Sequence, residues 1–401
     1  MKKLFFALAF SIIGVAAPAQ NISGTWQGDL VAGLQKLKLK LHLTDDGQCT
    51  LDSPNQGAYG IRGTIDFISA DSLSIHVGGG ITYSARLADG ELKGTFAQSG
   101  FKFPLNLQPG DDKPVVRPQT PVPPYPYTTE EVTFVNAEGG TTLAGTLTVP
   151  DGARCVVLMV TGSGPQNRDE ELFLHKPFAV LADRLARAGI ATLRYDDRGV
   201  GQTVGGRAND NTQELSGDAL AGIEWLRQSG RFKKVGILGH SEGGLIAFML
   251  GGQHKVDFIV SLAGSAVRGD SVLLTQSKAL GGDAAKDLTI EQLREMPDLK
   301  NDNWVRWFLD YDPQPAIAQI QCPVMALNGS KDLQVLASQN LPALRRTLPA
   351  DKRHLIKQYD GLNHLFQHSD TGQPSEYGDI EETFSDEAIS DIAAWLQQFN
   401  K

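Results

Sequence analysis

Three residues of this chain have the types and the order that nucleophilic catalysis requires: a serine, an aspartate and a histidine. Ser241 lies in the stretch GHSEGG (239–244), a G-x-S-x-G pattern between two apolar runs. This pattern predicts a sharp turn from a strand into a helix, which exposes the serine hydroxyl at the edge of a sheet. A serine is activated by a neighbouring base, and a histidine base is oriented by a carboxylate.

The predicted carboxylate and base are Asp332 and His364, each just past an apolar strand-like run. Asp332 follows CPVMALNG (322–329), and His364 follows RHLIKQY (353–359). The chain order serine, acid, histidine is the one that this kind of turn uses. Loops at the carboxyl ends of parallel strands meet at one edge of a sheet. The sequence therefore predicts a triad of Ser241, Asp332 and His364.

Other residues compete for two of these roles. Asp310 and Asp312 are rival acids, but Asp312 precedes a proline and is typical of the start of a turn. His368 is the rival base, and it lies in the polar stretch FQHSDTGQ, which is typical of a solvated loop. We expect none of the three in the triad.

Backbone N–H groups are the expected donors to a developing oxyanion. The first is the N–H of Glu242, at the start of the predicted helix, and we expect this group to matter more than the Glu242 side chain. The second is expected in TGSGPQNRDE (161–170), whose glycines let the backbone approach a bound carbonyl closely. Ser163 is the first choice there and Gly164 the second.

Two charged stretches are expected to support this edge rather than to react. Arg168, Asp169 and Glu170 are predicted to anchor the 161–170 loop by ion pairs. In YDDRGVGQT (195–203), Asp197 and Arg198 are predicted to fix a turn, because the stretch lacks the G-x-G-x-x-G pattern of a dinucleotide site.

The elements that must position these residues begin near residue 129. A predicted hairpin (EEVTFVN, then TTLAGTLTVP) is followed by apolar strand-like runs that alternate with amphipathic helical patterns. Such a succession predicts a mostly parallel sheet with helices on both faces. The predicted strands after the hairpin are 154–162, 190–196, 234–240, 256–264, 322–329 and 353–359, and the predicted helices include 176–189, 217–229, 243–252, 338–348 and 386–399.

Residues 20–108 have a different pattern, that of a small all-β unit. LKLKLHL (37–43) alternates strictly, and turn residues such as DDG and ADG separate further strand-like runs. We expect a small antiparallel barrel or sandwich, with Trp26 in its core. Residues 109–128 are rich in proline, which stiffens an extended chain, and they predict a linker or an ordered strap.

The first 19 residues have the pattern of a signal peptide. Lys2 and Lys3 precede an apolar stretch that is too short to span a bilayer, and APA (17–19) offers a cleavage site. We therefore expect export to the periplasm or the extracellular space.

Composition excludes several classes of function. The formal net charge of −9 disfavours nucleic acids and anionic membranes as partners. Cys49, Cys155 and Cys322 lie far apart, with neither a metal-ligand spacing nor a disulfide framework. We expect buried thiols and no metal site, while a bridge made by Cys49 stays open.

The motifs from TGSGPQNRDE to GLNHLF, with GHSEGG and NGSKDLQV between them, resemble the α/β-hydrolase superfamily over residues 129–401. The closest resemblance is to exported bacterial serine esterases, often called serine aminopeptidase-like, that carry an extra N-terminal β domain. The resemblance implies a triad of Ser241, Asp332 and His364, oxyanion donors at Ser163 and Glu242, and hydrolysis of short acyl esters without a cofactor. Thr161 departs from the His-Gly form that is common in the oxyanion loop of this superfamily.

Residues 265–321, which are helix-like, lie where such hydrolases insert a lid. Within WVRWFLDY, four aromatic residues share one helical face, and packing against the sheet unit or lining of an acyl pocket are both open to them. The sequence thus predicts an esterase acting on a small-molecule ester. The alternatives are a serine peptidase, aminopeptidase or lysophospholipase with the same triad, or a binding protein on an inactive hydrolase fold.

Overall fold

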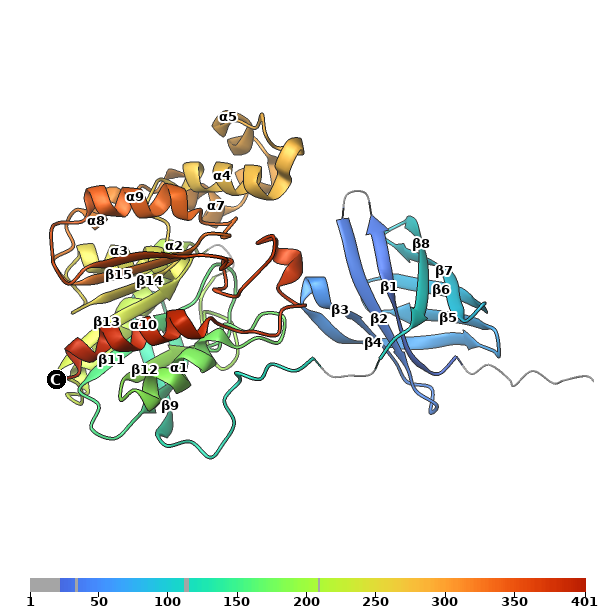
Figure 1. Cartoon of the computed structure of the whole chain (residues 1–401), viewed down its shortest axis with the longest axis horizontal. Helices are drawn as coiled ribbons and strands as arrows, with labels where there is room; N and C mark the ends of the chain where they lie inside the picture. The colour runs from blue at the N-terminus through green and yellow to red at the C-terminus, as the bar shows by residue number, and fades with distance from the viewer. Residues whose placement is uncertain (1–21, 33–34, 112–114, 208–209) are drawn as a thin grey trace, which may run out of the picture. The chain divides into compact units, whose positions relative to one another are not determined.

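The computed structural model describes residues 22–32, 35–111, 115–207 and 210–401 (Figure 1). The chain divides into two compact units, residues 1–114 and 115–401. The predicted signal peptide, residues 1–19, lies outside the described residues. In the described part of the chain, the helices are all too short or too polar to cross a membrane.

The N-terminal unit is a closed barrel of antiparallel strands. Of the two predicted alternatives, a barrel or a sandwich, the structure therefore has the barrel. Period-two alternation places Leu39, Leu41 and Leu43 of one strand in the core. Trp26 also lies in this core, and its Nε1 donates a hydrogen bond to the Ile22 carbonyl (2.8 Å). The strands are β1 (Gly24–Ala32), β2 (Gln35–Leu43), β3 (Cys49–Ser53), β4 (Ala58–Ile68), β5 (Ser72–Val77), β6 (Ile81–Ala88), β7 (Glu91–Gln98) and β8 (Phe101–Pro109), with the short helix η1 (Pro54–Gln56) after β3.

Residues 115–127, called the strap below, belong to the C-terminal unit, within the stretch 109–128 that the sequence predicts to be a linker or an ordered strap. The Arg117 guanidinium donates to three backbone carbonyls of that unit, and the Gln119 amide bonds to the backbone of Thr383 and Phe384. The Tyr127 hydroxyl donates to the Asp183 carboxylate (2.8 Å). The strap is therefore fixed by specific hydrogen bonds along its length.

The C-terminal unit is built on an eight-stranded sheet in the order β16-β15-β14-β13-β11-β12-β10-β9. The last six strands of the chain run parallel, and β10 pairs antiparallel with both β9 and β12. This sheet confirms the predicted α/β class and the predicted hairpin. The strands are β9 (Thr128–Asn136), β10 (Thr141–Val149), β11 (Cys155–Val160), β12 (Ala191–Tyr195), β13 (Lys234–His240), β14 (Ile259–Leu262), β15 (Val324–Gly329) and β16 (Leu355–Tyr359).

Helices cover both faces of this sheet because its central strands are apolar on both sides. In β11, Val156 and Leu158 belong to the core shared with α2, α3 and α9, whereas Val157 and Met159 belong to the core shared with α1 and α10. The layers can be followed in Figure 1. These helices are α1 (Pro177–Arg187), α2 (Thr212–Gln228), α3 (Glu242–Gly252), α9 (Ala337–Thr347) and α10 (Asp386–Leu396), with η4 (Gln397–Phe399) after α10.

A group of short helices follows β14, within the predicted insertion at 265–321. Its helix α7 packs an aromatic face against α3 and α4, in a cluster with Leu245 and Met249. The helices are α4 (Gly269–Gly281), η2 (Gly282–Ala284), α5 (Ile290–Arg294), α6 (Pro297–Lys300), α7 (Asn303–Asp310) and α8 (Gln314–Ile317). One more short helix, η3 (Pro374–Glu376), lies between β16 and α10.

Cys49, Cys155 and Cys322 are free thiols, and Cys49 lies inside the barrel, away from a disulfide partner. Among the described residues, no cluster of histidine, cysteine and carboxylate side chains could hold a metal ion.

Candidate active site

Ser241 occupies the turn between β13 and α3. Its backbone has φ 52° and ψ −112°, a left-handed conformation that side-chain-bearing residues rarely adopt. The Ser241 N–H donates to the Leu262 carbonyl at the end of the neighbouring strand β14 (2.8 Å). Such strain persists only where the surroundings enforce it, and it is typical of functional sites.

Steric constraints explain why Gly239 and Gly243 of the motif are glycines. A Cβ at Gly239 would lie 1.9 Å from the Gly243 carbonyl oxygen, and a Cβ at Gly243 would lie 2.1 Å from that of Val160. Neither position has room for a side chain, because α3 starts directly against the ends of β11 and β13. The close approach keeps the turn tight and Ser241 at the carboxyl edge of the sheet.

Asp332 and His364 meet at the same edge, from the loops after β15 and β16. His364 Nδ1 lies 2.8 Å from Asp332 Oδ2, and both side chains are buried. Asp332 Oδ1 accepts hydrogen bonds from the N–H groups of Gln334 and Val335, and Oδ2 accepts one from the Asn328 amide. A carboxylate that accepts four hydrogen bonds has both oxygens engaged and is held in one orientation.

The rival residues have other partners. Asp310 is an exposed partner of Arg294, and Asp312 accepts a hydrogen bond from the Gln314 N–H at the start of α8. His368 pairs with Glu382 at the surface. The structure therefore brings His364 together with Asp332 and with none of the rivals.

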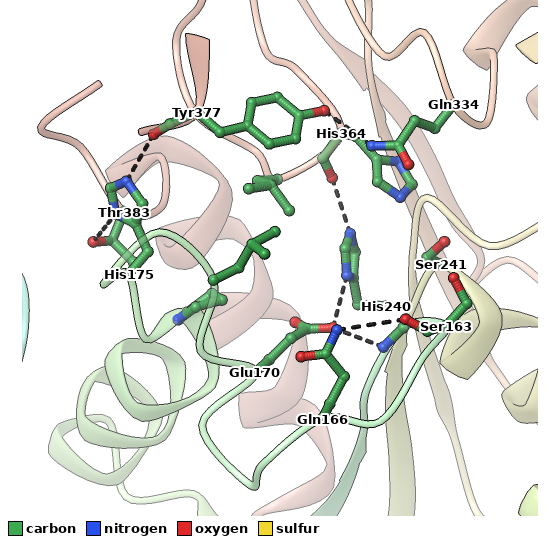
Figure 2. Close-up of a pocket in the computed structure, with 14 residues that line it drawn as sticks. Ser163, Gln166, Glu170, His175, His240, Ser241, Gln334, His364, Tyr377 and Thr383 are labelled. Atoms are coloured by element: carbon green, nitrogen blue, oxygen red, sulfur yellow. Dashed lines mark hydrogen bonds and ion pairs between the residues drawn. The ribbon is translucent and has the colours of Figure 1, made fainter. Parts of the chain in front are cut away.

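A cavity opens beside Ser241 and His364, and Figure 2 shows the side chains that line it. Its empty volume is about 560 Å³, including open solvent at the mouth. Most of the lining comes from two segments that are far apart in the sequence, 162–177 and 364–383. The lining residues are Gly162, Ser163, Gln166, Glu170, Leu172, His175, Pro177, His240, Ser241, Gln334, His364, Leu365, Tyr377 and Thr383.

The predicted oxyanion donors lie next to the serine. A Cβ placed on Gly162 would be 3.4 Å from the Ser241 Cβ, so the 161–170 loop runs directly past the nucleophile. The Gly162 N–H donates a hydrogen bond to Glu170 Oε1 (2.7 Å). The N–H groups of Ser163 and Glu242 donate to no group among the described residues, and both remain predicted donors.

The charged residues of the oxyanion loop have divided roles. Arg168 pairs with Asp196 and Glu131, and Asp169 pairs with Arg194, which anchors the loop to the sheet. Glu170 of the same loop instead turns into the cavity and pairs with His240 (2.9 Å).

The stretch 195–203 also has a supporting role. Asp197 accepts hydrogen bonds from the Thr161 hydroxyl and from the Gln166 N–H. Arg198 pairs with Asp210 and Asp218.

The Glu242 side chain has a role that the sequence pattern does not reveal. It is buried, and its Oε1 accepts hydrogen bonds from the Thr212 hydroxyl and from Trp304 Nε1 on α7 (both 2.6 Å). Burial raises the pKa of Glu242, and these two hydrogen bonds oppose that rise. The carboxyl group thus connects the helix that follows Ser241 to the helical insertion.

Two findings about the cavity lining add to what the sequence predicted. The aromatic residues of α7 are not among the lining residues, and they pack in the cluster on α3 and α4 instead. The lining includes His175, Tyr377 and Gln334, which no motif singled out. His175 is held by Thr383 and by the Tyr377 carbonyl, and burial lowers its pKa to about 4, so it is neutral.

Several known proteins are similar to this chain over part of its length. Residues 176–370 match the family model described as serine aminopeptidase, S33. Esterase EstD of Thermotoga maritima is 28% identical over 273 residues, covering 63% of this chain and 65% of that relative, slightly under two thirds of its length. Solved structures that match include Pyrococcus furiosus esterase Pf2001 (16% identity, 72% of this chain and 99% of that one, TM-score 0.49) and a dienelactone hydrolase of Anabaena variabilis (18%, 69% and 100%, 0.44).

The family match covers β12 to β16 and includes the Ser241 turn. The sheet has an antiparallel hairpin at one edge, and the strained serine lies between β13 and α3, the strand–turn–helix position typical of this fold. The C-terminal unit of this chain has the fold of the α/β-hydrolase superfamily.

Proposed function

We propose that this protein is a serine hydrolase that cleaves carboxylic esters, with Ser241, His364 and Asp332 as its catalytic triad. The observation that carries the proposal is the buried His364–Asp332 hydrogen bond at the wall of a cavity that also contains Ser241. Because the Asp332 carboxylate accepts the proton on Nδ1, the other ring nitrogen of His364 is the basic one. A histidine in this tautomer can take a proton from a serine hydroxyl.

The reaction then follows from the roles of these groups. Ser241 Oγ attacks the ester carbonyl while His364 takes its proton, and the N–H groups of Ser163 and Glu242 stabilise the oxyanion. His364 returns the proton to the departing alcohol, which leaves an acyl-enzyme. Water, deprotonated by His364, attacks the acyl carbonyl and releases the acid, restoring Ser241.

The charges in the cavity favour an uncharged ester over the alternative substrates. The acidic side chain in its wall is Glu170, which is paired with His240, so the two charges cancel. A free ammonium, as in an aminopeptidase substrate, would lack an unpaired carboxylate there, and a phosphate would lack an unpaired cation. The family resemblance implies short acyl groups, and the name of the Thermotoga maritima relative, an esterase, supports ester hydrolysis.

The test compares the wild type with Ser241→Ala on p-nitrophenyl esters of increasing acyl length, beside an aminoacyl p-nitroanilide and a lysophospholipid. We expect turnover of the short esters above all, and a loss of about four decades or more in Ser241→Ala. A fluorophosphonate probe should label Ser241. Unchanged ester turnover in Ser241→Ala would refute the triad. Absence of labelling would favour the alternative of a binding protein on an inactive fold, and preference for the anilide would favour an aminopeptidase.

We also propose export, with cleavage after Ala19, on the strength of the sequence pattern alone. N-terminal sequencing of the protein from fractionated cells should begin at Gln20, in the periplasmic or extracellular fraction. An intact Met1 on the mature protein would contradict export.

A further inference from the structure

His240, the residue before Ser241, is a second buried histidine at the active site. Its Nδ1 lies 2.9 Å from Glu170 Oε1, and its Nε2 lies 2.9 Å from the backbone carbonyl oxygen of His364 (Figure 2). Both ring nitrogens are therefore occupied by partners, which come from the loops after β11 and β16.

The chemistry of these partners sets the protonation state of the ring. A carbonyl oxygen only accepts, so Nε2 must carry a hydrogen. Glu170 Oε1 already accepts the Gly162 N–H at 2.7 Å, so it acts as a carboxylate oxygen and Nδ1 must carry a hydrogen as well. With a hydrogen on both nitrogens, His240 is an imidazolium, and it forms a buried ion pair with Glu170.

The titration of His240 agrees with this assignment. Burial lowers its pKa, but the charge of Glu170 and the hydrogen bonds to Glu170 and to the His364 carbonyl outweigh burial, so the pKa lies above the ordinary histidine value. The groups that face His240 are Glu170, His364 and, further away, Asp332, whose charge also favours the imidazolium.

The ion pair touches both halves of the predicted catalytic machinery. On one side, Glu170 holds the Gly162 N–H, one residue before the predicted oxyanion donor Ser163. On the other side, His240 holds the backbone of His364, whose ring centroid lies 4.7 Å from that of His240. Glu170 has φ 53°, a strained backbone conformation that places its carboxylate at this point.

We propose that Glu170 and His240 act as a positioning pair, which fixes the oxyanion loop and the backbone of His364 relative to Ser241. This inference rests on the proposed serine-hydrolase function. The imidazolium donates one charge-assisted hydrogen bond to Glu170 in the oxyanion loop and one to the backbone carbonyl of His364, and so connects two segments that lie far apart in the sequence. No proton leaves the pair during the reaction.

A pH dependence follows from the imidazolium. Because the pKa of His240 is raised by folding, its contribution is fully present below the unfolded value and is lost as pH rises through the folded value. A neutral ring has one N–H and can serve only one of its two acceptors. The upper pH limit of activity should therefore depend on Glu170.

The test is Glu170→Gln, which keeps the size and the acceptor oxygen of the side chain but removes its charge. With p-nitrophenyl acetate, we expect kcat to fall about 10- to 100-fold, because misplaced catalytic groups cost rates of this order. KM should change little, and the alkaline limit of the kcat/KM profile should move to lower pH. The rate of fluorophosphonate labelling at Ser241 should fall in parallel. Adding His240→Gln to this variant should cost little more, because the two residues act as one unit.

The matched control is Glu171→Gln, the same substitution at the next residue. Glu171 bonds to Asn167 and Lys176 and does not line the cavity, so its pH profile should match that of the wild type. Two results would overturn the proposal: an unchanged kcat and alkaline limit in Glu170→Gln, or a loss explained entirely by a smaller folded fraction in thermal unfolding. Failure of the triad itself would appear separately, as activity retained by Ser241→Ala.

Discussion

At the scale of single residues, the site depends on the Asp332 carboxylate, whose hydrogen-bonding capacity is fully used. Asp332 accepts from His364, from Asn328 and from two backbone N–H groups, and it is buried. Such a carboxylate has one orientation, and it imposes one tautomer on His364. The direction of the hydrogen bond between His364 and Asp332, with Asp332 as the acceptor, is therefore what matters for catalysis.

Asp332→Asn tests the direction of this hydrogen bond. The amide oxygen can keep the two backbone N–H groups, which leaves the NH₂ group facing His364 Nδ1 and the Asn328 amide. His364 must then carry its proton on the other nitrogen, and it cannot accept one from Ser241. We expect kcat for p-nitrophenyl acetate to fall by about four decades. Thermal unfolding of the same sample is the control, and full activity in a folded Asp332→Asn variant would exclude Asp332 as the orienting acid.

At the scale of elements, the cavity is formed by loops that a residue of the strap connects through hydrogen bonds. The 162–177 segment and the 364–383 segment form most of its walls. Arg117, in the strap, donates to the carbonyl of Phe173 in the first wall and to those of Gly378 and Ile380 at the second. The distances are 2.7 to 2.9 Å, so a single guanidinium bridges both walls.

Arg117→Ala should loosen these walls without touching the triad. Three carbonyls lose a charged donor, and each such hydrogen bond contributes about 1.5–3 kcal/mol in favourable cases. We expect a lower unfolding temperature and a higher KM for p-nitrophenyl esters, with a smaller change in kcat.

The control for this substitution is Arg231→Ala. Arg231 belongs to the same unit and pairs with Glu130 at the exposed surface, where such pairs contribute little. Equal effects of the two substitutions on KM would contradict a specific role of Arg117 at the cavity.

At the scale of the whole molecule, the two units have separate cores. The barrel closes around its own cluster, which includes Trp26, Leu41 and Phe96. The residues that line the cavity all lie in the C-terminal unit, as do Asp332 and the strap. The chemistry proposed here therefore has all its groups in residues 115–401.

A chain of residues 115–401 should fold and hydrolyse p-nitrophenyl acetate with kcat/KM within about threefold of the full chain, because a unit with its own core can fold alone. A chain that starts at residue 129 lacks the strap, and it should be less stable in urea. Loss of activity in a folded 115–401 chain would show that the barrel takes part in catalysis.

The sequence alone predicted the class of fold and the three triad candidates. Hydrophobic periodicity reports which faces of a strand are buried, so the α/β sheet and the β unit could be recognised from local patterns. Ser241 could be found because its turn needs glycines at fixed offsets, and Asp332 and His364 because chain order and strand ends bring them to one edge. Their catalytic roles stay predictions until Ser241 and Asp332 are substituted.

Only the tertiary structure decided what surrounds those residues. The Glu170–His240 pair joins positions 70 residues apart, and Arg117 reaches a carbonyl 263 residues away. The cavity is lined mostly by residues of the segments after β11 and β16, while the aromatic face of α7 packs on α3. Sequence patterns report local backbone structure, whereas side-chain partners depend on how distant loops pack, and no local pattern contains that information.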